Sequence, residues 1–484
     1  MTRARPSSPA DDPPVMGSRT RPRWAAGIAG HVTGPVGSRV GIVVVTTVVI
    51  GYVIADRFFA YFGFQIGSVP VYPGEIAIVI GLATLTFGLR APGRWTTGRS
   101  WAILFLAWAA FVFLLRLPGQ PFIDSVRDFS FVYYAAFAIF GFKLPWERFD
   151  TRAFSVIAYV FVAQLCFSML ELVKPFPQSW LGGYAQFFGR PDIEGATLAA
   201  GVGFFLLADD RLRMPRVPRV LIILAEIAVA LLTASRAVFL CLLLVLGVVL
   251  LSKRARAFRL PVLAGLVAGG LILVAFPRAG FDTDRGELRF TTTFVRLGAT
   301  FGLAPEETSA AGGPRSGHAT SGSSSNLSPV VAEATLNWRT HWWAKLLQDS
   351  LDRPSWLVLG RGFGPNLATE VHYVGTDPQH PLRAPHDIAI DVLARLGVIG
   401  LLLWVGWMLT VAAAGLRAAR RPGPQGTLAL WMLLYWACIM IVAMLGVILE
   451  SPFGAAPFFF LTGGLLRLEV LSRTQASVVR APSG

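Results

Sequence analysis

The sequence has little charge and few cysteines. Only 15% of its 484 residues are charged, whereas 54% are hydrophobic. This composition excludes the common classes of soluble protein and predicts a chain embedded in a lipid bilayer. The three cysteines, Cys166, Cys241 and Cys438, all lie inside apolar runs. The sequence therefore predicts neither a disulfide framework nor a thiolate metal site.

Acidic residues are scarce too: 28 Asp and Glu stand against 43 Lys and Arg, which gives a formal net charge of +15. In a soluble protein this excess would suggest a nucleic-acid partner. Here the positions of the Lys and Arg residues explain the excess of positive charge. If the N-terminus is cytoplasmic, 26 of the 43 lie in cytoplasmic segments. This bias follows the positive-inside rule. We therefore expect both termini in the cytoplasm and no nucleic-acid partner.

The chain divides into two polar tails and a long apolar region between them. Residues 1–38, rich in Pro, Ser, Gly and Arg, predict a disordered cytoplasmic tail rather than a signal peptide, and residues 472–484 predict a second tail. Apolar segments predict an all-α integral membrane fold of about twelve transmembrane helices, nine within 39–276 and three within 386–471. These segments are 40–56, 75–89, 101–115, 129–142, 153–173, 195–208, 220–234, 237–251, 261–276, 396–416, 428–449 and 452–468.

Residues 220–251 are apolar almost throughout, but 32 residues of helix would be ~48 Å long, too long for one crossing without steep tilt. The sequence therefore predicts a turn at Ala234–Arg236. Residues 277–385 predict one long extracytoplasmic loop between spans nine and ten, with a flexible Gly-, Ser-, Ala- and Pro-rich insertion at 302–329. After the insertion, residues 334–351 have helical apolar spacing, and the glycines of 360–365 predict a tight turn rather than a nucleotide-binding loop.

Two residues stand out by their position. His386 begins an amphipathic helix, where the positive end of the helix dipole favours a neutral imidazole that can accept a proton. The alternative is that His386 caps the helix or lies at the membrane interface. Arg236 lies at membrane depth on the side where cations are scarce, which indicates a functional group. The alternative is that its side chain extends to the outer surface.

A third candidate is Arg339, which lies beside Trp338, Trp342 and Trp343. Arginine binds phosphate through two donors, and indole rings can stack on the faces of sugars. The alternative is an ordinary belt of aromatic residues at the headgroup level. Glu226, within the seventh predicted span, is either a proton-relay group or a hydrogen-bonded structural acid.

His386-Asp387 is followed, after nine residues, by Gly397-Val398-Ile399-Gly400. This segment resembles the O-antigen ligase and polymerase-like membrane glycosyltransferases. The pattern of that family is His followed by Asn, Ser or Gln, nine residues, Gly, two residues and a small residue. Asp387 departs from it. Three further features are similar to the family: Ser235-Arg236, Trp338-Arg339 and Gly360-Arg361-Gly362. The order of the spans also fits, and the resemblance covers residues 40–470.

The resemblance implies transfer of a glycan from a polyprenyl diphosphate carrier to an acceptor hydroxyl, at the outer face of the cytoplasmic (inner) membrane. It implies neither a metal nor another cofactor. The partners would be the lipid-linked glycan, a glycan or lipid acceptor and membrane lipids. Arg236 and Arg339 would stabilise the leaving diphosphate, and His386 would be the base. Asp387 would contact substrate or orient His386.

The resemblance also suggests substrate-binding residues. Arg190 and Arg353 are each followed after ten residues by a glycine, a spacing associated with the polymerase branch of the family. Trp338 and Trp342 would hold sugars. The sequence does not separate a ligase from a polymerase. It also leaves open a transporter or flippase, or a scaffold that keeps the fold without activity.

Overall fold

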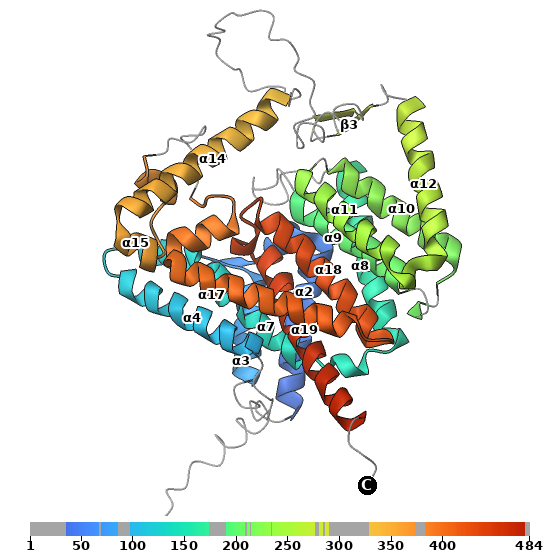
Figure 1. The fold of residues 1–484 in the computed structure, drawn as a ribbon, viewed down its shortest axis with the longest axis horizontal. Helices are drawn as coiled ribbons and strands as arrows, with labels where there is room; N and C mark the ends of the chain where they lie inside the picture. The colour runs from blue at the N-terminus through green and yellow to red at the C-terminus, as the bar shows by residue number, and fades with distance from the viewer. Residues whose placement is uncertain are drawn as a thin grey trace, which may run out of the picture.

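A computed structural model describes residues 35–66, 69–85, 97–173, 190–208, 211–212, 214–233, 235–275, 280–283, 286–289, 329–372 and 383–479. Almost all regular structure in these residues is helical. Figure 1 shows α14 at one end of the helical bundle and the C-terminal end of α19 at the opposite end.

Over most of their described residues, the twelve predicted apolar segments fall on helices. The fourth is divided by a break at Tyr134–Ala135, and the eleventh, 428–449, runs past the end of α18 into the 3-10 turn at Ile448–Glu450. In chain order they are α2 (Pro35–Ala60), α3 (Pro73–Leu85), α4 (Thr97–Arg116), α6 (Ser130–Tyr133) with α7 (Ala136–Lys143), α8 (Thr151–Val173), α9 (Pro191–Leu207), α10 (Arg216–Leu232), α11 (Arg236–Leu251), α12 (Arg256–Ala275), α17 (Ile388–Ala419), α18 (Pro424–Ala443) and α19 (Pro452–Val479).

Among the described residues, six helices are long and apolar enough to cross a bilayer: α2, α4, α8, α17, α18 and α19. Most of the other apolar helices are shorter, for example the 16 residues of α11, which span only about 24 Å. The structure thus supports an all-α membrane protein, while twelve crossings stay a prediction. The predicted turn within 220–251 is present, because α10 ends at Leu232 and α11 begins at Arg236.

The remaining elements lie between the apolar helices. They are α5 (Phe122–Asp128), α14 (Pro329–Asp352), α15 (Pro354–Leu359), α16 (Leu367–Glu370), the 3-10 turns η2 (Trp146–Arg148), η5 (Lys253–Ala255) and η6 (Ile448–Glu450), and two antiparallel hairpins, β1 (Phe64–Ile66) with β2 (Val69–Val71) and β3 (Gly280–Thr283) with β4 (Gly286–Arg289). The predicted helix at 334–351 is thus the body of α14.

Some predicted boundaries shift or lie outside the described residues. The insertion at 302–329 falls outside them apart from Pro329, which begins α14. Of the predicted tail at 1–38, only the start of α2 is described. The second predicted tail, 472–484, is partly helical, since α19 continues to Val479. Polar residues at the end of α19 are compatible with a helix that leaves the apolar layer.

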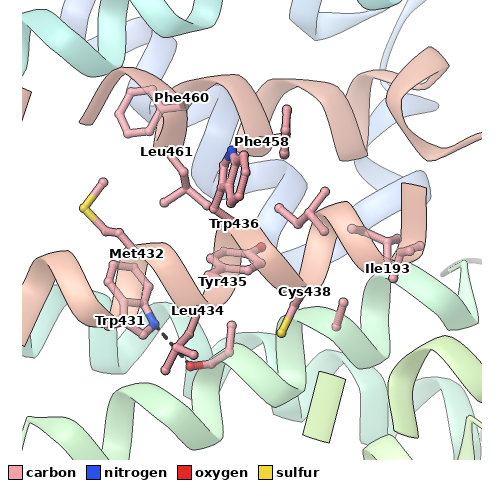
Figure 2. Close-up of a cluster of buried hydrophobic side chains, with 14 of the residues drawn as sticks. Ile193, Trp431, Met432, Leu434, Tyr435, Trp436, Cys438, Phe458, Phe460 and Leu461 are labelled. Atoms are coloured by element: carbon pink, nitrogen blue, oxygen red, sulfur yellow. Dashed lines mark hydrogen bonds between the residues drawn. The ribbon is translucent and has the colours of Figure 1, made fainter. Parts of the chain in front are cut away.

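The core lies where α9, α18 and α19 pack together (Figure 2). Every residue of α9 from Ile193 to Leu207 is buried, as expected for a helix that is apolar on all sides. The small residues of α9 permit close approach: a β-carbon on Gly195 would lie 2.4 Å from the side chain of Val238 in α11. Trp431 of α18 donates from its indole nitrogen to the carbonyl of Ala200 at 3.1 Å. Hence α9 is fixed from several sides, and so is the polar segment at its start.

Candidate functional site

His386 lies in the segment that leads into α17, in a conformation that is rare for its residue type. Its φ of 59° is in the left-handed region, which costs about 1 kcal/mol or more outside glycine. Its Nδ1 lies 2.9 Å from the carbonyl oxygen of Ala384. A carbonyl can only accept, so Nδ1 carries the proton in this contact and Nε2 carries the lone pair. His386 is therefore held in the tautomer that can take a proton at Nε2.

The surroundings of His386 keep it neutral. Burial lowers its pKa to about 4, and the positive charges of Arg339 and Arg190 act in the same direction, whereas the Ala384 carbonyl and Asp192 oppose them. At neutral pH the imidazole is accordingly uncharged. The sequence-based expectation of a neutral histidine therefore agrees with the structure, although burial contributes more than the helix start.

Asp387 is the residue that caps α17. Its Oδ1 accepts hydrogen bonds from the backbone N–H groups of Ala389 at 2.8 Å and Ile390 at 3.0 Å. Asp, Asn and Ser are similarly good N-caps. Asp387 thus caps α17, and His386 stands just outside the helix. Burial raises the pKa of Asp387, while the two backbone donors lower it.

Trp338 and Arg339 of α14 lie against His386. The indole of Trp338 meets the imidazole edge to face, with 5.7 Å between ring centroids, and the guanidinium of Arg339 lies 5.4 Å from the centroid of the Trp338 ring. Arg339 also donates from Nη1 to the carbonyl oxygen of Leu445 at 2.9 Å. α14 is therefore joined both to the segment before α17 and to the segment after α18.

Trp342 is placed differently from the sequence-based expectation. It is 0% exposed, and its ring stacks on Trp338 with 6.1 Å between centroids. A fully buried indole offers no face to a sugar. In this structure Trp342 supports Trp338 rather than lining a surface. Trp343, which the sequence also singled out, donates from Nε1 to the carbonyl of Pro385 at 2.7 Å and fixes the residue before His386.

Arg190 and Arg236 reach the same region from the starts of α9 and α11. The backbone N–H of Arg190 donates to Oδ2 of Asp56 in α2 at 2.7 Å. Nη2 of Arg190 lies beside Gly446, 3.7 Å from the place where a β-carbon would stand. Arg236 is the first residue of α11 and follows Ser235, whose hydroxyl donates to Oδ1 of Asp192 at 2.5 Å.

Charged residues from two other helices act electrostatically on Arg339. Burial lowers the pKa of Arg339, the nearby charges of Arg236 and Arg190 lower it further, and the carboxylate of Asp192 raises it. That Arg236, Arg339 and His386 form one site stays a prediction, and Asp192 was not among the residues that the sequence singled out.

Arg353 makes its contacts away from this group. Its guanidinium lies 4.0 Å from the centroid of the Trp356 ring and 3.6 Å from Asp349, and its side chain is 53% exposed. Glu226 is likewise separate: it is buried in α10, where Oε1 would lie 2.4 Å from a β-carbon on Gly201 of α9. Within the described part of the chain, neither carboxylate oxygen of Glu226 has a hydrogen-bond partner, which is not what a hydrogen-bonded structural acid would show.

A shallow hollow lies between the start of α17 and the segment after α18. Its lining residues are Asp387, Ile388, Gly446, Val447, Leu449 and Glu450. Among the described residues, no group of three His, Cys, Asp or Glu side chains is arranged to hold a metal ion.

The two glycine motifs position the site together. Gly397 has a φ of 69°, which kinks α17 and leaves the preceding carbonyls without helical partners. The backbone N–H groups of Arg361 and Gly362 donate to these carbonyls, on Ala394 at 2.9 Å and Arg395 at 3.0 Å. The predicted turn at 360–365 is therefore present, and it serves to hold the first half of α17.

A buried ionic network fixes the same half-helix, and the sequence did not point to it. Arg395 bonds to Asp391 at 2.9 Å and to Asp128 of α5 at 3.0 Å, and Arg383 bonds to the same Asp128 carboxylate at 3.2 Å. The available signal was the pairing of Asp391 and Arg395 four residues apart in an otherwise apolar stretch.

Comparison with known proteins finds a matching family. The sequence profile of the O-antigen ligase family matches residues 219–405. This range includes Arg236, Arg339, His386 and both glycine motifs, whereas Arg190 precedes it. No curated protein matches the chain. The resemblance to O-antigen ligases is thus confirmed over these residues, and together with the long apolar helices it indicates a multi-pass membrane protein that acts in cell-surface polysaccharide assembly by glycosyl transfer from lipid-linked glycans.

Proposed function

We propose that this chain, whose residues 219–405 match the O-antigen ligase family, transfers a glycan from a polyprenyl diphosphate carrier to an acceptor hydroxyl. The reaction takes place at the outer face of the cytoplasmic membrane and needs no metal or other cofactor. The observation that carries the proposal is the contact of His386 with Trp338 of α14, beside Arg339, whose charge acts on the imidazole and on which the charges of Arg190 and Arg236 act in turn. Guanidinium groups suit a diphosphate, and the imidazole suits a hydroxyl.

The guanidinium groups bind the leaving group. When the bond between the anomeric carbon and the phosphate oxygen breaks, its electron pair stays on the diphosphate, and negative charge grows on that oxygen. Arg236 and Arg339 stabilise this charge with fixed N–H donors, and Arg190 adds a third positive charge from the start of α9. Burial of Arg339 strengthens the interaction because little water competes with it.

His386 takes the proton of the acceptor. The acceptor hydroxyl loses its proton to Nε2 while its oxygen attacks the anomeric carbon, so the new glycosidic bond forms as the bond to the diphosphate breaks. Trp338, half-buried beside His386, presents a flat apolar surface on which a sugar ring can stack. Asp387 keeps α17 capped and thereby fixes the position of the imidazole.

The orientation in the membrane follows from the distribution of cations. We propose about twelve crossings, with both termini cytoplasmic and the site facing outward. The apolar helices that are too short for a full bilayer, such as α11, would then cross a locally thinned membrane or end below the headgroups. A transporter or flippase is the alternative function. The lone Glu226, buried without a hydrogen-bond partner, favours that alternative, whereas the site residues at the helix ends favour chemistry at the surface.

The test is transfer by the purified full-length protein in detergent with a metal chelator. The donor is a polyprenyl diphosphate oligosaccharide, and the acceptors are a second copy of the donor and a lipid-linked saccharide. We expect His386→Ala, Arg236→Ala and Arg339→Ala to abolish transfer, and the control Arg353→Ala to stay within about threefold of wild type. Elongated donor identifies a polymerase, and a glycosylated lipid acceptor identifies a ligase. No product with any acceptor, from a folded protein, contradicts the proposal.

A further inference from the structure

We propose that Asp192 is a positioning residue of this site, which holds Arg236 in place and supplies the negative charge that balances the three arginines. The inference rests on the proposed function for its effect on transfer. It goes beyond that function because it assigns a role to a residue outside the region that matches the family profile.

The first observation is that Ser235 does not make the usual N-cap hydrogen bond. Ser235 is the N-cap residue of α11, and serine at this position usually bonds to a backbone N–H of its own helix, which stabilises the helix by about 1 kcal/mol. Here the hydroxyl makes no such bond and donates to Asp192 instead. The hydrogen bond from Ser235 therefore joins the start of α11 to α9 instead of capping α11. A bond of this kind restricts the position of the next residue, Arg236.

The second observation is the charge around Asp192. Its carboxylate acts on Arg339 in α14 and on His386 before α17, and in both cases it opposes the effect of the arginines. The other charged groups that face His386 are Arg339, Arg190 and, as its chain neighbour, Asp387. With Asp192 ionised, the three guanidinium groups can remain close together before the diphosphate arrives. Without it, less of their mutual repulsion is compensated, because among the described residues only Asp387 then acts on Arg339 and Asp56 on Arg190.

Two substitutions separate the two roles of Asp192. Asp192→Asn keeps an oxygen that can accept from Ser235 but removes the charge. Ser235→Ala keeps the charge but removes the hydrogen bond. We expect Ser235→Ala to lower kcat about tenfold, the usual size of one hydrogen bond to a charged group, because Arg236 is no longer held. Asp192→Glu restores the charge and serves as the conservative control.

The decisive measurement is the titration of His386 by NMR in protein labelled at its six histidines, without substrate. The signal is assigned with His386→Ala. All variants are made in an Arg339→Gln background, where the loss of one nearby positive charge moves the transition to a more accessible pH. We expect Asp192→Asn to shift the pKa of His386 downward, and Asp192→Glu and Ser235→Ala to leave it unchanged.

An unchanged His386 titration in Asp192→Asn overturns the charge-balancing role, whatever the transfer assay gives. If Ser235→Ala, measured with Arg339 intact, has the wild-type kcat, then the hydrogen bond from Ser235 to Asp192 does not position Arg236. Failure of the proposed function looks different: the titration shift in Asp192→Asn is still present, but the unmodified protein transfers no glycan to any acceptor. The two proposals are therefore tested by separate outcomes.

Discussion

The pH dependence of transfer follows from the environment of His386. An ordinary histidine with a pKa of 6.5 is only about one quarter neutral at pH 6. With its pKa lowered to about 4 by burial, Arg339 and Arg190, His386 is about 99% neutral at the same pH. If His386 is the base, transfer needs the neutral form. The rate is therefore expected to be independent of this group above about pH 5 and to fall as the pH drops through 4.

The assay is kcat/KM for the lipid-linked donor between pH 3.5 and 8, since this quantity reports groups of the free enzyme. We expect a bend near pH 4. The kcat profile, which reports the enzyme with substrate bound, should bend at higher pH, because the bound diphosphate offsets the charges of Arg339 and Arg190. Size-exclusion profiles at each pH separate loss of activity from loss of fold. A bend of kcat/KM near 6.5 would refute this account of His386.

Three further predictions concern the parts that hold the site. Arg361→Met removes a guanidinium whose side chain is 1% exposed and which bridges two carboxylates, so α14 should lose about 3 kcal/mol of local stability in hydrogen exchange. Gly397→Ala should lower the thermal midpoint by several degrees, because a β-carbon there would lie 2.2 Å from the carbonyl oxygen of Val358 at a positive φ. Asp387→Asn keeps the cap and should retain transfer within about threefold, whereas Asp387→Ala should cost about 1 kcal/mol of stability in thermal unfolding.

The helices could be predicted from the sequence because apolar run length is a strong signal in a membrane protein. The turn before Arg236 followed from helix length and from the Arg-rich stretches on both sides of residues 220–251. The number of crossings could not be derived in the same way. Segments such as α11 are apolar but short, and their length alone does not decide whether they cross the bilayer or end within it.

The site was predictable where a residue stands out locally. Arg236 does so as a charge in an apolar stretch, and His386 does so at a helix start followed by spaced glycines. Trp342 misled for the same reason: a cluster of tryptophans looks alike whether a ring faces substrate or the interior, and only the packed structure shows that Trp342 is fully buried. The distinction depends on which side of α14 faces α17, and spacing within α14 does not determine that.

Asp192 and Asp128 show why the remaining site residues could not be found. Asp192 lies in the first turn of α9, where aspartate is common for local reasons, and Asp128 is the last residue of α5. Their importance arises from partners far along the chain: Ser235 for Asp192, and Arg383 and Arg395 for Asp128. A residue that works by balancing distant charges has no local pattern, because its spacing to those partners is set by the fold. Residues of this kind should therefore be sought among buried acids that contact arginines from other helices, and substitutions that keep their shape but remove their charge are the way to identify them.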